Sequence, residues 1–542
     1  MDARRDRSPD RHLPAGGGPG PRCSASRPPS RRPPGPLTVA GQATPVPPID
    51  VDAPADGVRY RFGDQHVEVD DRLLERLRVV CTKVDTDDAS RVDAGRDWWP
   101  LAILWATAGT VPARPAVVAR PTDATEVSGL LALCNEARVP VTPVAGRSGV
   151  CGASVPVFGG VSLDLCALRG VGAVDAVSSV VDVGAGTFGV DLEAELRSRH
   201  GVTLGHWPQS MELSTVGGWL ACRSAGQYST RYGKIEDMVV GLDVVLADGR
   251  VVHTGGSPRA ATGPDLTQLF VGSEGTLGVI TGSRLRAHPV PTEDRRLARG
   301  FSSFAEGLEA CRRTLRRGAT PAVLRLYDEV ESARTFGADD TCVLVVLDEG
   351  DPVLIDATER IVAEECARSA AETLDDALVE RWLEHRNDVS ALAALARRHI
   401  VVDTIEIAAR WAALLPIYDD AVSRLRSLDG TLAASAHQSH AYSDGACLYF
   451  TFAGQGPAPD DLGWAEAYYT QAWRSVMEVT TAHGGAISHH HGVGLNRARF
   501  LAPALGGAFE TLVDLKAAMD PRGILNPGKL GLPSPFGGAV WP

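Results

Sequence analysis

The sequence lacks the features that mark several common classes of protein. Its ten cysteines include no CxxC pair and no zinc-type spacing, which argues against a zinc domain or a disulfide framework and favours a reducing cytoplasm. No run of about 18 apolar residues occurs, so a membrane-spanning helix is not expected. The net charge of −13 lacks the basic excess of a general nucleic-acid binder.

The N-terminus also lacks the apolar segment of a secretory signal. Residues 1–40 contain eight Arg, nine Pro and three Asp, but no Lys. Such a composition cannot bury apolar surface. We therefore predict a disordered Pro/Arg-rich tail over residues 1–48. A weak tether to an anionic surface, an inert extension and a start codon assigned too early remain open as explanations.

The rest of the chain has the composition of a globular protein, with 44% hydrophobic and 22% charged residues overall. Residues 49–112 form a lead-in with helical patches. Residues 113–288 mix strands with a capped helix and carry an Asp-Gly hairpin signal at residues 248–249. Residues 289–465 mix helices and strands, and residues 466–542 continue a long helix that leads into three histidines. The pattern predicts an α+β protein without internal repeats.

Three glycine-rich segments stand out beside the apolar strands. The loop "VAGRSGVCGA", residues 144–153, can wrap N–H groups around an anion, although it matches neither GxGxxG nor a P-loop. Residues 205–241 and 261–281 offer backbone with little side chain, which a flat polar ligand can approach closely. Each segment alone could be structural, but three in one α+β unit predict a large dinucleotide site.

The stretch "AISHHHGVGLNR" places three histidines in a row. On an extended backbone, His489 and His491 share a face and His490 points away. Two imidazoles on one side can tune each other's protonation near neutral pH. A zinc site would need further ligands, and a solvated histidine-rich loop remains open as an alternative.

Several longer motifs carry a resemblance to a known group: "MELSTVGGWLACRSAG", "YGKIEDMVV", "TGPDLTQLFVGSEGTLGVIT", "LRLYD", "DGACLYFTF" and "SHHHGVG". They resemble FAD proteins of the vanillyl-alcohol-oxidase and p-cresol-methylhydroxylase type, over about residues 120–530. Within that group they look most like the alkyldihydroxyacetonephosphate synthases (alkylglycerone-phosphate synthases) of ether-lipid synthesis. The resemblance implies a two-lobed α+β fold with an FAD-binding domain at residues 113–288, a mixed-sheet cap at residues 289–465, and a C-terminal segment that completes the flavin site.

The same resemblance implies a reaction and its partners. The acyl group of acyl-dihydroxyacetone phosphate is exchanged for a fatty alcohol without net redox change. A lipid substrate in turn implies transient contact with a membrane surface. We expect a cytoplasmic protein that binds no nucleic acid, and a homodimer is left open.

The resemblance also implies which residues hold FAD. The diphosphate would lie on the first loop, the flavin and ribityl chain on the second segment, and the adenosine on the third. The implied residues are Val144, Ala145, Gly146, Arg147, Ser148, Gly149, Val150, Cys151 and Gly152, then Pro208, Ser210, Thr215, Gly217 and Gly218, and finally Glu274, Gly275, Thr276, Val279 and Ile280.

The implied active-site residues are Arg223, Arg325, Tyr449, His489, His490 and His491. Tyr449 and His491 suit proton transfer, whereas the other two histidines add donors or charge. Because a guanidinium stays protonated in proteins, Arg325 is better suited to polarise a carbonyl or hold a phosphate than to act as a base.

The sequence departs from the patterns of this group at several positions. Cys151 stands where covalent flavoproteins carry a histidine, so we expect non-covalent FAD. Residues 227–230, "QYST", replace a lysine-bearing segment, and Thr451 replaces a second tyrosine. These two changes affect the expected phosphate contact and lipid tunnel more than the flavin site.

Other functions remain open on the same residues. D-2-hydroxyacid dehydrogenases of this superfamily hold a metal with two histidines and a glutamate. Here His440 occupies the first histidine slot, with His437 nearby, while Tyr449 and His490 occupy the other two ligand slots. Because these groups make a poor divalent site, we expect no metal. A non-catalytic flavin-binding protein and an oxidase that reduces oxygen are further alternatives.

Overall fold

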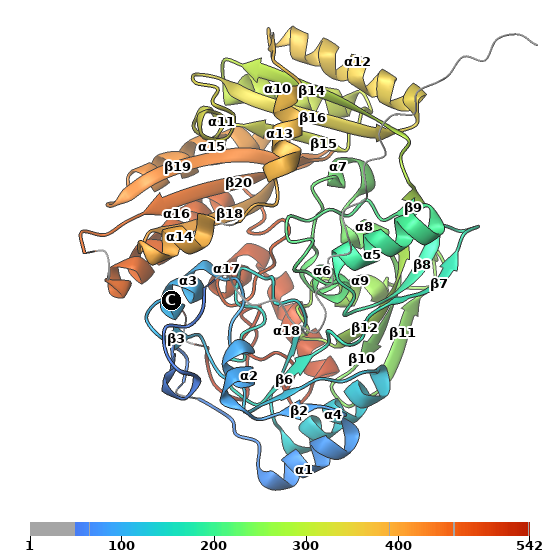
Figure 1. Cartoon of the computed structure of the whole chain (residues 1–542), viewed down its shortest axis with the longest axis vertical. Coiled ribbons are helices and arrows are strands. Elements are labelled where there is room, and N and C mark those ends of the chain that lie inside the picture. The colour runs from blue at the N-terminus through green and yellow to red at the C-terminus, as the bar shows by residue number, and fades with distance from the viewer. Residues whose placement is uncertain (1–48, 64, 390, 459–460, 540, 542) are drawn as a thin grey trace, which may run out of the picture. The chain divides into compact units, whose positions relative to one another are not determined.

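The computed structural model describes residues 49–63, 65–389, 391–458, 461–539 and 541 (Figure 1). The predicted tail at residues 1–48 lies outside the described residues. The described part confirms the expected α+β class, with two domains that each contain a sheet covered by helices. None of the helices described combines the length and apolar character needed to cross a bilayer.

The lead-in is more than a helical patch, because it adds a strand and a helix to the first domain. Strand β2 pairs with β4, and helix α1 packs on α4. Its elements are η1 (Ala55–Gly57), β1 (Arg59–Tyr60), α1 (Asp71–Val80), β2 (Val84–Asp85), α2 (Asp88–Asp93), α3 (Pro100–Ala106) and β3 (Thr110–Val111).

The first domain contains a four-stranded sheet in the order β2-β4-β6-β5 and a five-stranded sheet in the order β11-β10-β12-β8-β7. Its elements are β4 (Val117–Ala119), α4 (Ala124–Ala137), β5 (Val141–Val144), β6 (Val161–Asp164), β7 (Val171–Asp175), β8 (Val180–Gly184), α5 (Gly189–Glu195), η2 (Leu196–His200), β9 (Val202–Thr203), α6 (Val216–Cys222), α7 (Ser229–Tyr232), α8 (Ile235–Met238), β10 (Val239–Val245), β11 (Val251–Gly255), α9 (Leu266–Phe270), β12 (Val279–Arg286) and β13 (His288–Pro289).

Local signals account for several of these elements. Asp123 caps α4, since its carboxylate accepts the N–H groups of Thr125 and Glu126. Strands β10 and β11 pair antiparallel across the predicted Asp248–Gly249 turn, where Gly249 adopts a positive φ of 87°. The capped helix and the hairpin expected from the sequence are therefore confirmed.

The second domain is built on a seven-stranded sheet in the order β17-β14-β16-β15-β19-β20-β18. Its elements are β14 (Glu293–Phe301), α10 (Phe304–Arg316), β15 (Val323–Tyr327), α11 (Glu329–Phe336), β16 (Cys342–Gly350), α12 (Pro352–Arg368), β17 (Glu372–Thr373), α13 (Ala377–His385), α14 (Ala391–Arg397), β18 (Val401–Arg410), α15 (Trp411–Arg426), β19 (Thr431–Ala441), β20 (Gly445–Gly454) and α16 (Leu462–Ala482).

Every strand pair in this sheet is antiparallel, whereas the expected cap sheet was mixed. The hairpin between β19 and β20 accounts for part of the difference, because a short turn can join only antiparallel strands. Strand β16 is buried along most of its length. Alternate residues of this strand belong to the hydrophobic clusters on the two faces of the sheet, which explains its continuous apolar run.

The C-terminal part returns to the first domain after α16. The predicted boundary between residues 465 and 466 falls inside this helix, which begins at Leu462. Helices α17 (Ala498–Leu505) and α18 (Ala508–Met519) follow. The buried ammonium of Lys516 donates to the carbonyl oxygens of Thr276 and Leu525 and to the carboxylate of Asp520, at 2.6–2.8 Å. One lysine therefore joins α18 to the third glycine-rich segment.

Lys516→Met tests this junction. The substitution keeps the alkyl chain but leaves two buried carbonyl oxygens without this donor and the Asp520 carboxylate without its cation, so we expect a loss of about 2–4 kcal/mol in the free energy of unfolding. The shift of the urea midpoint, followed by circular dichroism, measures it. Lys83→Met removes a lysine whose side chain is 61% exposed and serves as the control. Equal shifts for the two variants would contradict the assignment.

Candidate functional site

The last three strands of the cap sheet, β19, β20 and the edge strand β18, bring polar side chains together. Tyr449 on β20 lies directly opposite Glu406 on β18 and His437 on β19. Directly paired residues project from the same face of a sheet. A register shift between Gln438 and His440 of β19 places His440 opposite Cys447 of β20.

Glu406 anchors the histidine triplet to this sheet. Its carboxylate is fully buried and accepts the backbone N–H groups of His489, His490 and His491. It also accepts the Ser488 hydroxyl at 2.9 Å and pairs with the buried guanidinium of Arg497 at 2.8 Å. Three consecutive amides that converge on one carboxylate require a bent backbone.

The prediction that His490 points away from its neighbours is therefore wrong. The Nδ1 atoms of His489 and His490 are 2.9 Å apart, and the rings of His490 and His491 lie 4.5 Å apart. The alternation of side chains applies only to an extended segment, and the Glu406 carboxylate bends this one. All three imidazoles belong to one cluster.

Burial controls the protonation of the triplet. Desolvation, with smaller contributions from neighbouring imidazoles and Lys234, holds the pKa values of His489 and His490 well below the ordinary value. Burial also lowers the pKa of His491, to about 4, against an opposing effect of Glu406. The three rings are neutral at pH 7, so they do not titrate near neutrality as the sequence suggested.

Tyr449 and His491 form a donor–acceptor pair. Burial raises the pKa of Tyr449, so the phenol keeps its proton. Its oxygen accepts the Thr404 hydroxyl at 3.0 Å and lies 3.5 Å from Nε2 of His491. The other ring nitrogen of His491, Nδ1, makes no hydrogen bond among the residues described and lies 3.7 Å from a Glu406 oxygen. The neutral imidazole can therefore accept a proton and the phenol can donate one.

Arg325 belongs to this cluster, whereas Arg223 does not. The guanidinium of Arg325 lies 2.5 Å from Nε2 of His437 and beside the rings of Tyr327 and Trp382. Arg223 follows α6, has a side chain that is 46% exposed, and faces Glu236 at 3.5 Å. In the described part of the chain no contact joins Arg223 to Tyr449 or to the triplet.

The first glycine-rich loop has the properties of an anion site. The N–H groups of Arg147 to Cys151 donate to no acceptor within the described ranges. Arg147 adopts a φ of 49°, and its buried Nε and Nη1 also lack partners there. A Cβ added at Gly149 would meet only an oxygen of Asp97, at 3.7 Å. Free donors around open space fit the diphosphate of a dinucleotide.

The other two segments meet this loop. A Cβ at Gly146 would lie 2.1 Å from the carbonyl oxygen of Leu213, and one at Gly275 would lie 2.9 Å from Pro143, the residue that precedes the loop in β5. Gly218, in the first turn of α6, is open on its outer side. A Cβ added there would meet only the Thr215 hydroxyl, at 3.5 Å. The structure thus brings the three predicted segments together.

The remaining predicted residues have defined local roles. Gly217 packs against Ala185, the carbonyl of Ser210 accepts the N–H groups of Leu213 and Ser214, and the Thr276 hydroxyl bonds to Ser273. Pro208, Val279 and Ile280 are buried. The carboxylate of Glu274, implied as an adenosine contact, instead accepts the N–H groups of Val493 and Gly494 at 2.6–3.1 Å.

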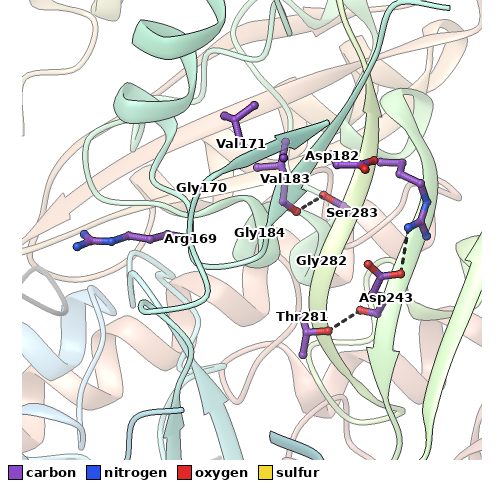
Figure 2. A pocket seen from close by; sticks show the side chains of 12 residues that line it. Arg169, Gly170, Val171, Asp182, Val183, Gly184, Asp243, Thr281, Gly282 and Ser283 are labelled. Carbon is purple, nitrogen blue, oxygen red and sulfur yellow. Dashed lines mark hydrogen bonds and ion pairs between the residues drawn. The ribbon is translucent and has the colours of Figure 1, made fainter. Parts of the chain in front are cut away.

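A pocket of about 380 Å³ lies elsewhere, on the sheet of the first domain (Figure 2). Asp243 is held there by Arg284 at 3.0 Å, and its carbonyl accepts the Thr281 hydroxyl. None of the predicted cofactor or active-site residues lines this pocket. It therefore has no part in the site.

Four groups approach the arrangement of a metal site. Glu406, Cys447, His489 and His490 each offer a ligand atom within 4.8 Å of the others. The Glu406 oxygens, however, already accept five donors. Burial raises the pKa of the Cys447 thiol, which disfavours the thiolate that a metal requires. Two imidazoles remain, and the absence of a metal stays a prediction.

Sequence reasoning missed two carboxylates of the site. Glu406 is a charged residue between the apolar Ile405 and Ile407 in the strand segment "VVDTIEIAAR", and that position was a usable signal. Glu331, which accepts His437 Nδ1 at 2.6 Å, lies in the polar stretch "YDEVES", where nothing distinguishes it.

Glu406→Ala tests the anchor of the triplet. It would leave a buried guanidinium at Arg497 uncompensated and three amides without an acceptor, so we expect a loss of about 3–5 kcal/mol of stability. The denaturation midpoint measures this loss. Glu478→Ala removes an exposed partner of Arg424 and should cost less than about 1 kcal/mol. If the two variants were equally stable, Glu406 would not be the anchor.

Comparisons with known proteins agree with these observations. A family model for an FAD binding domain matches residues 115–255, and one for the C-terminal domain of FAD linked oxidases matches residues 290–530. The uncharacterized FAD-linked oxidoreductase YgcU of Escherichia coli (strain K12) is 32% identical over 431 residues, 77% of this chain and 89% of that protein. Alkyldihydroxyacetonephosphate synthase of Dictyostelium discoideum is 30% identical over 458 residues, 78% and 74% of the two chains. Glycolate oxidase subunit GlcD of Bacillus subtilis (strain 168) is 28% identical over 77% of this chain and 89% of its own length.

Solved structures show the same fold. An alkyldihydroxyacetonephosphate synthase superposes with a TM-score of 0.72 at 25% identity and covers 89% of this chain and 90% of its own. The fold of p-cresol methylhydroxylase gives a TM-score of 0.68 at 18% identity, with 85% and 96% covered. The chain therefore belongs to the FAD-linked oxidoreductases that join an FAD binding domain to an FAD-linked oxidase C-terminal domain, and FAD is its cofactor.

Proposed function

We propose that the protein is an alkyltransferase of the alkyldihydroxyacetonephosphate synthase type, which exchanges the acyl group of an acyl-dihydroxyacetone phosphate for a fatty alcohol. The observation that carries this proposal is the convergence of Tyr449, His491 and Arg325 at one face of the cap sheet. A phenol that keeps its proton, a neutral imidazole and a fixed cation are the groups that such an exchange needs.

The two proton transfers of the exchange have separate carriers. The departing carboxylate needs a proton, which the phenol of Tyr449 can donate. The incoming alcohol must lose a proton, which the neutral His491 can accept. Since 3.5 Å separates the two groups, the proton taken from the alcohol can restore the phenol. The Thr404 hydroxyl bonds to the Tyr449 oxygen and would stabilise a transient phenolate.

Arg325 supplies the positive charge. Its guanidinium would hold the phosphate or polarise the ketone carbonyl. The three histidines are neutral and therefore add no positive charge of their own. The first glycine-rich loop would hold the FAD diphosphate, and the open side of Gly218 would face the flavin. FAD, when bound, supplies the nucleophilic centre of the reaction. We further propose a cytoplasmic enzyme with non-covalently bound FAD that contacts a membrane surface transiently, because both proposed organic substrates are lipids.

A second candidate is oxidation of a 2-hydroxyacid. The YgcU protein and the glycolate oxidase subunit match this chain over a similar share of its length. The rings of His440 and Tyr449 also lie 5.1 and 6.0 Å from that of His490, so the three metal-ligand slots of the dehydrogenases converge here, two of them with other residue types. This candidate requires reduction of the flavin by its substrate, whereas the exchange does not.

The two candidates predict different assays. With palmitoyl-dihydroxyacetone phosphate and deuterated hexadecanol, we expect the purified yellow protein to form the deuterated alkyl product, detected by mass spectrometry, without hydrogen peroxide. Tyr449→Phe and His491→Ala should each lower the rate at least about a hundredfold with FAD still bound, since each removes a proton carrier. His253→Ala, at a side chain that is 72% exposed, is the control.

Full activity in either site variant would show that the assigned roles are wrong. Anaerobic bleaching of the flavin by D-lactate, glycolate or D-2-hydroxyglutarate, without exchange, would favour the oxidation. A colourless protein that takes up no FAD would contradict both candidates.

The pH dependence follows from the low pKa of His491. Burial lowers this pKa from 6.5 to about 4, and only the neutral imidazole acts as a base. The rate of exchange should therefore stay level from pH 7 to about pH 5 and fall as the pH approaches 4. Rates measured over this range, with circular dichroism at each pH as a check on folding, test the expectation. A midpoint near 6.5 would instead indicate an unshifted histidine.

A further inference from the structure

A chain of three side chains ends at the guanidinium of Arg325. Glu331 on α11 accepts Nδ1–H of His437 at 2.6 Å, and Nε2 of His437 lies 2.5 Å from Nη2 of Arg325. Glu331 is 2% and His437 7% exposed by side chain. The three residues come from α11, β19 and β15, so only the folded cap brings them together.

The two bonds of His437 fix its tautomer. A guanidinium has no acceptor, so Nε2 of His437 must offer its lone pair to Arg325. The ring proton then lies on Nδ1, where the carboxylate of Glu331 accepts it. Because both ring nitrogens are engaged, His437 is not free to act as a general base. His437 therefore serves as a connector between the Glu331 carboxylate and the Arg325 guanidinium.

Surrounding groups hold Glu331 in its ionised form. Burial alone would raise the pKa of Glu331, but His437, Arg334 and the Thr451 hydroxyl lower it to about 2. Thr451 donates to the carboxylate at 2.7 Å, and Ser435 donates at 3.1 Å. Thr451 replaces a tyrosine of the synthase pattern, and this bond gives the replacement a structural purpose.

The ring of His437 also contacts two aromatic rings. It stacks on Tyr449 at a centroid distance of 4.9 Å and lies 5.0 Å from the ring of Tyr327. One face of the connector therefore touches the proposed proton donor. The buried Nε of Arg325 has no partner among the described residues, so part of the guanidinium is left for a further acceptor.

We propose that Glu331 and His437 are positioning residues that orient Arg325 toward an oxyanion of the substrate, a phosphate or a carboxylate. The inference rests on the proposed function only in that Arg325 contacts substrate. The imidazole between the two charges keeps the carboxylate from covering the guanidinium. A direct Arg–Glu pair would commonly be bidentate and would engage the edge that the substrate needs.

The test uses the holoenzyme with ¹⁵N-labelled histidine and two probe anions, inorganic phosphate and acetate. In the wild type, NMR should show His437 protonated at Nδ1, with the resonance assigned by its loss in His437→Phe. Glu331→Ala removes the acceptor that holds the ring against Arg325, so the ring can turn away from the guanidinium and the Nδ1–H tautomer should be lost. The same variant should weaken binding of the preferred anion about tenfold by calorimetry, because a charge-assisted bond loses its orientation. The probe anion that binds more tightly shows whether the oxyanion that Arg325 holds is a phosphate or a carboxylate.

Two further variants separate positioning from folding. His437→Phe keeps an aromatic ring between Tyr327 and Tyr449 but removes both nitrogens, so it should weaken anion binding as much as Glu331→Ala. Glu331→Gln keeps an acceptor and should largely restore the tautomer and the affinity. Glu365→Ala, which removes another carboxylate with a 2% exposed side chain, paired with Arg313 at 2.8 Å in the α10–α12 packing, should leave both readouts unchanged.

An unchanged anion affinity in His437→Phe, or an unchanged tautomer in Glu331→Ala, would overturn the proposal. So would a wild-type holoenzyme that binds neither anion. If exchange activity is absent while the tautomer and affinity shifts appear as expected, the positioning of Arg325 holds and the alkyltransferase assignment fails.

Discussion

The ion pair between Glu406 and Arg497 is the constraint on which the rest of the site depends. Both side chains are fully buried, and the pair closes at 2.8 Å. An isolated charge at either position would cost several kcal/mol, on the order of 3–5 by comparison with other broken buried pairs. The pair is therefore tolerated only with its full set of donors, and three of those donors are the amides of the histidine triplet. A charge requirement thus determines the backbone conformation of the segment proposed to be catalytic.

The hydrogen bonds of Glu406 to the triplet involve none of the imidazole nitrogens. Glu406 bonds the triplet through the backbone, so the rings need not be protonated to be held. Glu331 acts differently, because it bonds the ring of His437 and through it the side chain of Arg325. Tyr449 lies opposite both Glu406 and His437 in the sheet. The proposed proton carriers and the Arg325 cation therefore lie close to two buried carboxylates, where low dielectric strengthens each interaction.

The sequence allowed the local elements and the cofactor loops to be predicted, because their signals are local. The cap at Asp123, the Asp-Gly hairpin and the glycine-rich segments each depend on residues within one short stretch. The role of Glu406 and the orientation of His490 could not be obtained in this way. They follow from a bond between residues more than 80 positions apart, which overrides the alternation of an extended strand. The antiparallel cap likewise depends on pairing that no single segment reveals.

A second carboxylate connects the triplet to the cofactor segment. Glu274 lies in the third glycine-rich segment, and its side chain accepts the amides of Val493 and Gly494. Gly492 has a φ of 80°, and a Cβ there would lie 2.5 Å from a Glu274 oxygen, so only glycine fits this turn. Residues 488–494 are thus held by Glu406 of the cap at one end and by Glu274 of the FAD-binding domain at the other. Because the same short segment bridges both domains, the loop that carries the proposed proton acceptor cannot shift without disturbing either the cap sheet or the backbone predicted to bind FAD.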